Sequence, residues 1–329
     1  MKPVIIGIAG FELTPAEIAL IRTHRPTGVI LFARNVVDPA QLAALTAHLT
    51  RLLPPLGVVM VDQEGGRVAR LRPPHWPAHP TAAALGVLFA ANAPAGLRAA
   101  WLTGALIGVD ARDAGFDVVC APVLDRFVPG AHDVIGDRAF ASDPAAVGEL
   151  GAAFGAGLLA AGVQPVAKHA PGHGRAGIDS HHGLPLLDAV WSDDLVPFAR
   201  CAHLPWMMTA HIVYAAQDPD QPATLSPAII ADVIRDAVGF QGVLVSDDLA
   251  MGALSGTPSA RVLAALAAGC DIALHCSGVL DDNAALLAAC PEPTEAALQR
   301  LRTAVFLADR SRQAFDLADL VTERMELLC

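Results

Sequence analysis

The chain has 329 residues, of which 53% are hydrophobic and 17% charged, and its formal net charge is −11 at pH 7. This length and apolar content allow one large barrel or two modest domains around a sizeable core. The negative charge argues against nucleic acid or an anionic membrane surface as a partner. Six scattered cysteines without a Cys-x-x-Cys pair argue against a zinc ribbon or a dense disulfide framework, and they fit a reducing compartment.

The N-terminal segment predicts neither export nor membrane insertion. Its short apolar stretch, residues 4–11, is followed by Glu12 and Thr14-Pro15, which are typical of a helix start and not of a signal-peptide cleavage site. The longest uncharged runs, residues 73–96 and 150–167, contain proline or several glycines and indicate a loop and a buried helix. We therefore expect a cytoplasmic protein with no membrane partner.

Eight short apolar runs suited to buried strands recur along the chain. They are residues 4–9, 28–32, 58–61, 117–121, 164–167, 206–209, 242–245 and 271–274. Between them lie segments of helical character, several of which open with a capping residue followed by proline. These pairs are Thr14-Pro15, Asp38-Pro39, Asp143-Pro144, Ser226-Pro227 and Thr257-Pro258. Glu17 and Gln41 lie three residues after their caps, which predicts two capping boxes.

Strands that are apolar throughout and alternate with helices indicate a parallel sheet covered on both faces. Eight such units predict an α/β fold, a single (β/α)8 TIM-like barrel over residues 1–329, with residues 278–329 as closing helices. An open doubly wound sheet is the second candidate. It would need a glycine-rich phosphate turn after the first strand, and residues 7–11 are a poor version of one.

Charged and imidazole side chains directly follow several of the predicted strands. They are Asp62, Gln63 and Glu64 after the third strand, Lys168 and His169 after the fifth, His211 after the sixth, and Asp247 and Asp248 after the seventh, with Asp125 and Arg126 a little beyond the fourth. Active sites of such barrels lie where strands end. A single charge there could be a cap or a buried ion pair, but the set predicts a catalytic pocket.

The segment from Lys168 to His181 concentrates titratable groups further. Its fourteen residues hold a lysine, three histidines and Asp179, interrupted by proline and glycine. Such a segment is expected to be a loop, and loops that gather titratable side chains usually carry function.

Two kinds of chemistry fit these groups, since the chain has neither a Gly-x-Ser-x-Gly elbow nor a Walker loop. The first is a metal-dependent hydrolase, with ligands drawn from the aspartates and from His169, His173, His181, His182 and His211. Amidohydrolase barrels, however, typically place a His-x-His pair after the first strand, where this chain has Ala9-Gly10-Phe11. The second is glycosyl transfer to water, whose retaining form needs a carboxylate and an acid/base group about 5 Å apart.

Several motifs in chain order carry a resemblance. They are Gly28-Val29-Ile30-Leu31-Phe32-Ala33-Arg34-Asn35, Asp62-Gln63-Glu64-Gly65-Gly66-Arg67-Val68-Ala69-Arg70-Leu71, Pro74-His75-Trp76-Pro77, Lys168-His169-x-Pro171-Gly172-His173-Gly174, Asp179-Ser180-His181 and Ser246-Asp247-Asp248-Leu249-x-Met251. Together they resemble the bacterial β-N-acetylglucosaminidases of glycoside hydrolase family 3. The matches run from the second strand to the loop after the seventh.

The resemblance implies a retaining mechanism through a covalent glycosyl-enzyme. It makes Asp247 the nucleophile, with Asp248 as its rival, and His181 the acid/base, supported by Asp179. In an extended loop, side chains two residues apart can point to the same side, and a carboxylate beside an imidazole raises its basicity and fixes its tautomer.

The sugar-binding residues implied by the resemblance form a second set. They are Asp62, Arg70, Arg138, Lys168 and His169, and we add His211 at the end of the sixth strand. Arg138 lies in Gly136-Asp137-Arg138-Ala139-Phe140, which is close to the family pattern Gly-x-Arg-x-Phe. No metal and no other cofactor is implied.

Two positions depart from the family pattern. Ala170 stands where the family usually has phenylalanine, which would loosen the pocket wall, and Arg175-Ala176-Gly177 in the loop is idiosyncratic and could alter the leaving-group site.

The function expected from the resemblance is a monomeric exo-β-N-acetylglucosaminidase. It would remove terminal non-reducing GlcNAc from peptidoglycan fragments, GlcNAc–anhydro-MurNAc and its peptides. Three alternatives stay open: a phosphorylase on the same fold, a metal-dependent amidohydrolase, and a sugar-binding protein without catalysis.

Overall fold

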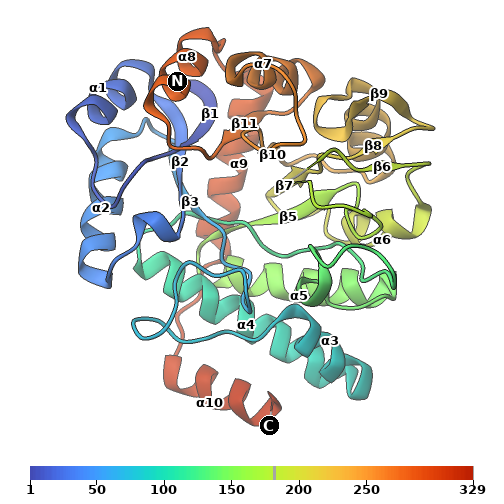
Figure 1. Ribbon diagram of the computed structural model, residues 1–329. Coiled ribbons are helices and arrows are strands. Elements are labelled where there is room, and N and C mark those ends of the chain that lie inside the picture. The colour runs from blue at the N-terminus through green and yellow to red at the C-terminus, as the bar shows by residue number, and fades with distance from the viewer. Residues whose placement is uncertain (181–182, 329) are drawn as a thin grey trace.

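The computed structural model describes residues 1–180 and 183–328, and within them eight parallel strands close into a barrel (Figure 1). The strands are β1 (Lys2–Gly7), β2 (Pro26–Leu31), β3 (Val58–Val61), β4 (Val118–Val119), β5 (Gln164–Ala170), β7 (Trp206–Thr209), β10 (Val243–Asp248) and β11 (Ile272–His275). Closure is made by β1, which pairs with β2 on one side and β11 on the other. The predicted TIM-like barrel and its eight strands are confirmed.

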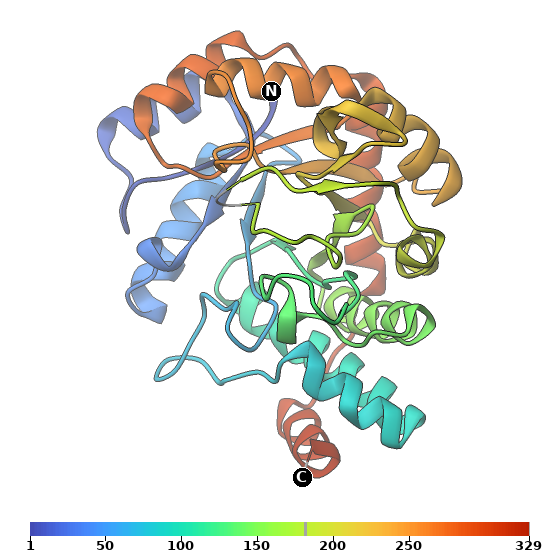
Figure 2. The same cartoon turned by 45° about the vertical axis from the view of Figure 1, so that its right-hand side comes forward.

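Helices cover the outside of the barrel (Figure 2). They are α1 (Pro15–His24), α2 (Pro39–Leu52), α3 (Ala82–Ala91), α4 (Ala93–Asp113), α5 (Pro144–Ala160), α6 (Ser192–Arg200), the π-helix η4 (Ile229–Ala237), α7 (Pro258–Ala268), α8 (Leu280–Ala289), α9 (Glu295–Ser311) and α10 (Leu317–Leu328). Short 3-10 turns are η1 (Ala33–Asn35), η2 (Gly136–Arg138) and η3 (Ala223–Leu225). Three of these helices, α8, α9 and α10, lie between residues 280 and 328. No helix of the described chain is long and apolar enough to cross a membrane.

The predicted helix starts hold, with one difference. Thr14 and Glu17 form a full capping box at α1. Asp38 caps α2 by accepting the amide of Gln41, but the Gln41 side chain turns away and bonds the backbone of Val37, Phe11 and Asn35. Asp143 and Thr257 cap α5 and α7, and the Ser226 hydroxyl accepts the amide of Ile229 ahead of η4. The capping box predicted at Asp38 is therefore wrong, since the glutamine ties the helix to the loop after β1 instead.

Strand alternation divides the apolar side chains between two layers. Side chains such as Ile5, Met60 and Trp206 fill the barrel interior, while their strand neighbours face the helices and form the larger core. The indole of Trp206 donates a hydrogen bond of 2.8 Å to the Gln164 side chain inside the barrel. Because these side chains fill the barrel interior, a ligand is expected to bind at the carboxyl ends of the strands.

A small sheet that the sequence did not predict lies beside the carboxyl ends of β5 and β7. It joins β6 (Leu186–Leu187), β8 (Val213–Tyr214) and β9 (Asp218–Pro222) in the order β6-β8-β9 (Figure 1). Strands of two residues, such as β6 and β8, leave no periodic signal, and the five residues of β9 include two prolines, which argue against a strand. The sheet connects the loop that follows β5 with the segment that follows β7.

Candidate active site

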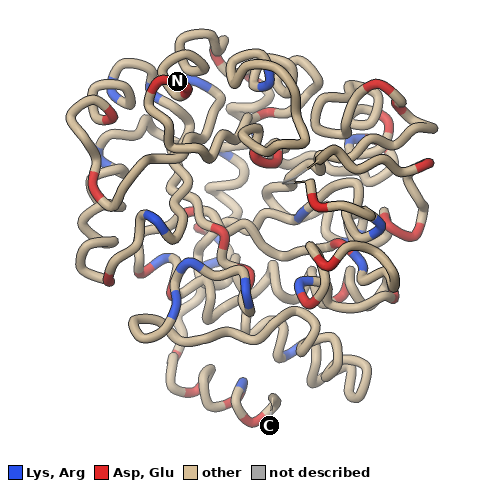
Figure 3. The backbone as a smooth tube through the Cα atoms, in the orientation of Figure 1, with Lys and Arg blue, Asp and Glu red and all other residues tan. Residues whose placement is uncertain are grey.

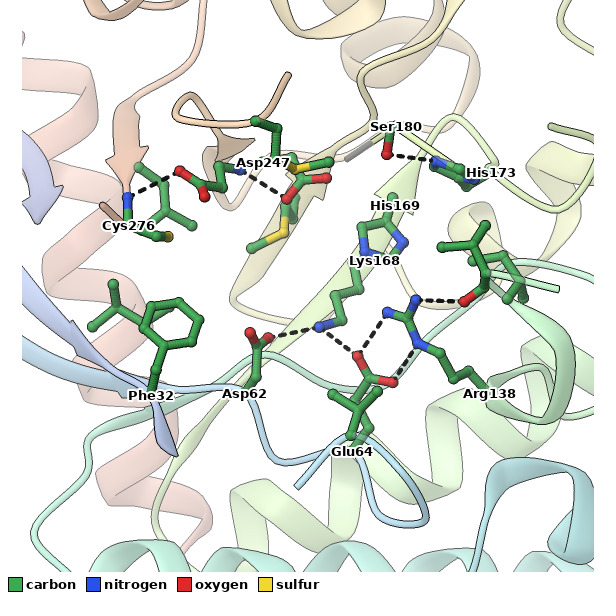
Figure 4. A pocket seen from close by; sticks show the side chains of 18 of the residues that line it. Phe32, Asp62, Glu64, Arg138, Lys168, His169, His173, Ser180, Asp247 and Cys276 are labelled. Atoms are coloured by element: carbon green, nitrogen blue, oxygen red, sulfur yellow. Dashed lines mark hydrogen bonds and ion pairs between the residues drawn. The ribbon is translucent and has the colours of Figure 1, made fainter. Parts of the chain in front are cut away.

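A cavity of about 280 Å³ opens at the carboxyl ends of the barrel strands (Figure 4). Its polar wall consists of Asp62, Glu64, Arg70, Arg138, Lys168, His169, His173, Ser180, Asp247 and Asp248, and its apolar wall includes Phe32, Met208 and Cys276. The volume lies near the lower limit of ligand pockets, about 300 Å³. A cavity of this size suits one small polar unit and not a long polymer.

Lys168 ties together two carboxylates from the end of β3. Its ammonium lies 2.9 Å from Asp62 and 2.7 Å from Glu64. The guanidinium of Arg138 donates hydrogen bonds of 2.8 and 2.9 Å to Glu64, and Arg70 donates one of 3.2 Å to Asp62. Three cations thus stand beside two anions in one wall, and Figure 3 shows residues of both signs near the centre of the view.

The ionisation of this wall follows from its pairing. Burial raises the pKa of Glu64, but Lys168 and Arg138 outweigh it and lower the value to about 2. The same opposition leaves the pKa of Asp62 below its usual range, with Lys168 and then Arg70 as the lowering partners. Both carboxylates therefore stay charged near neutral pH and can accept hydrogen bonds from hydroxyl groups.

Lys168 and His169 differ from the prediction in their position. Both lie within β5, which extends to Ala170, and the loop begins only at Pro171. Both side chains nevertheless line the cavity, as expected of strand ends. Ala170 is fully buried in the layer between barrel and helices and is not part of the cavity wall, so the expectation that it loosens that wall is wrong.

Asp125 organises the two histidines of the Lys168–Gly174 motif. One carboxylate oxygen lies 2.7 Å from Nδ1 of His169, and the other accepts the amides of His169 and His173 at 3.3 and 2.6 Å. His173 in turn lies 3.1 Å from the hydroxyl of Ser180. Burial lowers the pKa of His173 to about 4, so this imidazole is neutral at pH 7.

Neither Asp125 nor Glu64 was assigned a role from the sequence. Both stood among the polar residues after strands three and four, which was the available signal. Their partners lie far away in the chain, Lys168 and Arg138 for Glu64 and His169 for Asp125. Only the closed barrel brings these pairs together.

Asp247 and Asp248, at the end of β10, make different contacts. Asp248 accepts the amides of Ala250 and Cys276 at 2.8 and 2.9 Å, so its carboxylate fastens the loops after β10 and β11. Asp247 lies in the cavity wall and accepts the amide of Asp248 at 2.8 Å. Burial raises its pKa, yet His211, His169 and Lys168 among others lower it below the usual range overall. Asp247 is therefore an ionised carboxylate facing the cavity.

His211 differs from the expectation that it contacts the sugar. It is fully buried and is not part of the cavity wall. Its Nε2 lies 2.9 Å from the carbonyl oxygen of Asp248 and its Nδ1 lies 2.8 Å from the Thr224 hydroxyl. The ring thus stands behind the Asp247–Asp248 strand end, with both nitrogens engaged by the protein.

The loop after β5 carries the proposed acid/base pair. Asp179 is described and its carbonyl accepts the amide of Gly183 at 3.1 Å, whereas His181 and His182 lie outside the described residues. Arg175, one of the idiosyncratic positions, bonds Asp194 on α6 at 2.7 Å and stacks on Trp191 at 4.6 Å. Arg175 therefore anchors the start of this loop to the helix layer.

Comparison with known proteins decides the family. Residues 8–304 match the family described as Glycosyl hydrolase family 3 N terminal domain. The chain belongs to glycoside hydrolase family 3. Over 285 residues it is 40% identical to a β-hexosaminidase of Aromatoleum aromaticum, covering 84% of this chain and 80% of that protein. A β-hexosaminidase of Chromobacterium violaceum is also 40% identical, over 318 residues that cover 94% of this chain and 87% of that protein.

A solved structure shares the whole fold. NagZ from Neisseria gonorrhoeae, in complex with N-trifluoroacetyl-D-glucosamine, superposes with a TM-score of 0.88 at 31% identity, covering 100% of this chain and 98% of that one. The same protein has been crystallised with a zinc ion. The protein is therefore a glycoside hydrolase of the β-hexosaminidase type. This excludes the alternatives of a metal-dependent amidohydrolase and of a sugar-binding protein without catalysis.

Glu64 offers a first prediction about this family 3 site. Changing Glu64→Gln should cost about 3–5 kcal/mol of folding free energy at pH 7, because Lys168 and Arg138 lose a buried partner. The lowered pKa means that the carboxylate stabilises the fold fully above its ordinary value of 4.5 and less as the pH falls towards 2. Urea unfolding at pH 7 and pH 3 should therefore show a gap between wild type and variant that narrows in acid.

Glu292 supplies the control for that measurement. It is exposed, and among the described residues its ion pairs are with the N-terminus and Lys2 at the surface. Glu292→Gln should leave the unfolding midpoint almost unchanged. Equal midpoints for wild type and Glu64→Gln at pH 7 would show that Glu64 does not stabilise the site.

A second prediction concerns metal ions. Among the described residues no group of three His, Cys, Asp or Glu side chains is placed to hold one, and the chemistry expected here needs only a carboxylate and an imidazole. Exhaustive dialysis against EDTA should leave glycoside turnover unchanged. If dialysis abolished turnover and added zinc restored it, the prediction that no metal is required would be wrong.

Proposed function

We propose that the protein is a retaining exo-β-N-acetylglucosaminidase that removes terminal non-reducing GlcNAc from peptidoglycan fragments such as GlcNAc–anhydro-MurNAc and its peptides. The observation that carries the proposal is an ionised Asp247 facing an ion-paired wall across a cavity of about 280 Å³. The family 3 relatives, which include β-hexosaminidases and a NagZ bound to a glucosamine derivative, support the choice of sugar.

The wall opposite Asp247 is suited to hold the sugar. Asp62 is an ionised acceptor, and Lys168, Arg70 and Arg138 are donors held in place by ion pairs with Asp62 and Glu64. His169 is oriented by Asp125 through Nδ1. We assign these five cavity residues to the hydroxyl and acetamido groups of GlcNAc: Asp62, Arg70, Arg138, Lys168 and His169. Charge-assisted hydrogen bonds of this kind fix orientation as well as affinity.

The proposed reaction has two displacements at the anomeric carbon. A carboxylate oxygen of Asp247 bonds to that carbon while the glycosidic bond breaks, and the departing oxygen takes a proton from His181, which Asp179 supports. His181 then takes a proton from water, the water oxygen bonds to the same carbon, and the carboxylate of Asp247 is released. Two inversions leave the β configuration unchanged.

Two further attributes belong to the proposal. We place the enzyme in the cytoplasm, which is supported by five buried cysteines that are free in the described structure, Cys120, Cys201, Cys270, Cys276 and Cys290. We also take it to act as a monomer.

A substrate panel tests the proposal and separates it from phosphorolysis. Glycosides of 4-nitrophenol with GlcNAc, GalNAc and glucose should be compared, each with and without phosphate, and the disaccharide GlcNAc–anhydro-MurNAc added. We expect the GlcNAc glycosides to be turned over best and free GlcNAc to be the product in both buffers. Sugar 1-phosphate formed only with phosphate would make the enzyme a phosphorylase, and preference for glucose would contradict the substrate assignment.

A further inference from the structure

His211 stands behind the nucleophile in a fully buried polar cluster. The ring follows β7, and its cluster partners Thr209 and Thr224 are likewise completely buried. The carbonyl oxygen of Asp248, 2.9 Å from Nε2, can only accept a hydrogen bond, so Nε2 carries a proton. The ring therefore donates to the backbone that places Asp247.

Thr224 holds the other side of the ring and can serve two protonation states. Its hydroxyl lies 2.8 Å from Nδ1 of His211, 2.9 Å from the Thr209 hydroxyl and 3.0 Å from the carbonyl oxygen of Ala210. It can donate its proton to a neutral Nδ1, or donate to Ala210 and accept from a protonated Nδ1. Both arrangements keep every heavy atom in place, so the ring can hold a second proton without distortion.

The same cluster reaches Asp247 from the backbone side. The Thr209 hydroxyl accepts the Asp247 amide at 3.4 Å. The titratable groups near this cluster include Asp248 on β10, Lys168 and His169 on β5, which act on Asp247, and Cys270, whose thiol lies 3.8 Å from the Thr224 carbonyl oxygen. Burial alone would favour a neutral Asp247, and a neutral carboxyl is a poor nucleophile. Among the groups that oppose burial, His211 contributes most.

We propose that His211, held by Thr224, is a positioning residue that keeps the carboxylate of Asp247 ionised and in place, and that it does not bind the sugar. This rests on the proposed function, in which Asp247 is the nucleophile. The contacts of the ring allow an imidazolium behind this strand end, and a positive charge there favours the ionised form of a nearby carboxyl.

The pH dependence of kcat/KM with 4-nitrophenyl GlcNAc tests this inference in two variants. His211→Gln keeps an N–H for the Asp248 carbonyl but loses the charge, so the acidic limb should move up by about one pH unit or more. Thr224→Val keeps the ring but removes its hydroxyl partner, and should move the limb in the same direction by less. KM should change little in either variant.

Thr103→Val is the matched control. Thr103 is fully buried in α4, and its hydroxyl has no hydrogen-bond partner among the described residues. The limb should stay in place in this variant. An unmoved limb with a tenfold higher KM in His211→Gln would make His211 a sugar ligand and overturn the proposal. If kcat/KM fell equally at every pH and the acidic limb did not move, His211 would be a packing residue and the proposal would be wrong.

A second measurement does not depend on turnover. Carbon-13 NMR of labelled aspartate, with the Asp247 signal assigned from Asp247→Asn, reports the ionisation of that carboxyl directly. Its pKa should rise in His211→Gln and in Thr224→Val but not in Thr103→Val. An unchanged titration would overturn the inference, whereas absence of GlcNAc release by the wild type would count only against the proposed function.

Discussion

Asp247→Ala is expected to lower kcat/KM by about 10⁴-fold or more, the scale on which loss of one member of a catalytic set acts. The variant loses the carboxylate that we propose bonds to the anomeric carbon, but it keeps the cavity wall at β3 and β5 to which we assign the sugar. Binding of a GlcNAc-based inhibitor should therefore survive, measured by calorimetry. Added azide should restore part of the turnover by entering the space left by the side chain, and should give the α-glycosyl azide.

Asp248 provides the comparison. Its carboxylate fastens the amides of Ala250 and Cys276, so Asp248→Ala should loosen two loops and lower activity without any response to azide. Rescue by azide in Asp248→Ala and none in Asp247→Ala would exchange the two assignments.

His181→Ala should lose far more rate on a natural disaccharide than on an aryl glycoside. A sugar alkoxide is strongly basic and needs a proton as it leaves, whereas 4-nitrophenolate departs without one. General acid assistance is worth about 10²–10⁴-fold, so the difference between the two substrates should lie in this range. The measurement is kcat/KM for both substrates in wild type and variant.

Asp179→Ala should follow the same trend with a smaller effect. It leaves the imidazole in place but removes the carboxylate expected to orient it and support its charge. Equal losses on both substrates in His181→Ala would mean that this residue binds or places the sugar, and the next acid to test would be His173, which lies in the cavity wall.

The barrel was predictable because its signals are local. Eight apolar runs bounded by capped helices fix the strand count and the parallel pairing. Because the carboxyl ends of the strands meet at one mouth, the positions of Asp62, Lys168 and Asp247 in the sequence were enough to predict a shared pocket. The structure confirms that these three side chains line one cavity.

Other features depend on partners that the sequence does not reveal. Glu64 bonds Arg138, which lies 74 positions further along the chain, and also Lys168, so its bridging role emerges only when the barrel closes. His211 follows a strand as the rule requires, but its ring lies among Thr209, Thr224 and the Asp248 carbonyl and not in the cavity. The small sheet escaped prediction because β6 and β8 have only two residues each and β9 contains two prolines, which argue against a strand.

Trapping the glycosyl-enzyme tests the central proposal most directly. A fluorinated GlcNAc glycoside that forms the intermediate faster than it breaks down should add one sugar mass to the protein, and peptide mass spectrometry should place that mass on Asp247. The label should be absent in Asp247→Ala and present in Asp248→Ala. Labelling that survives in Asp247→Ala and disappears in Asp248→Ala would contradict the account.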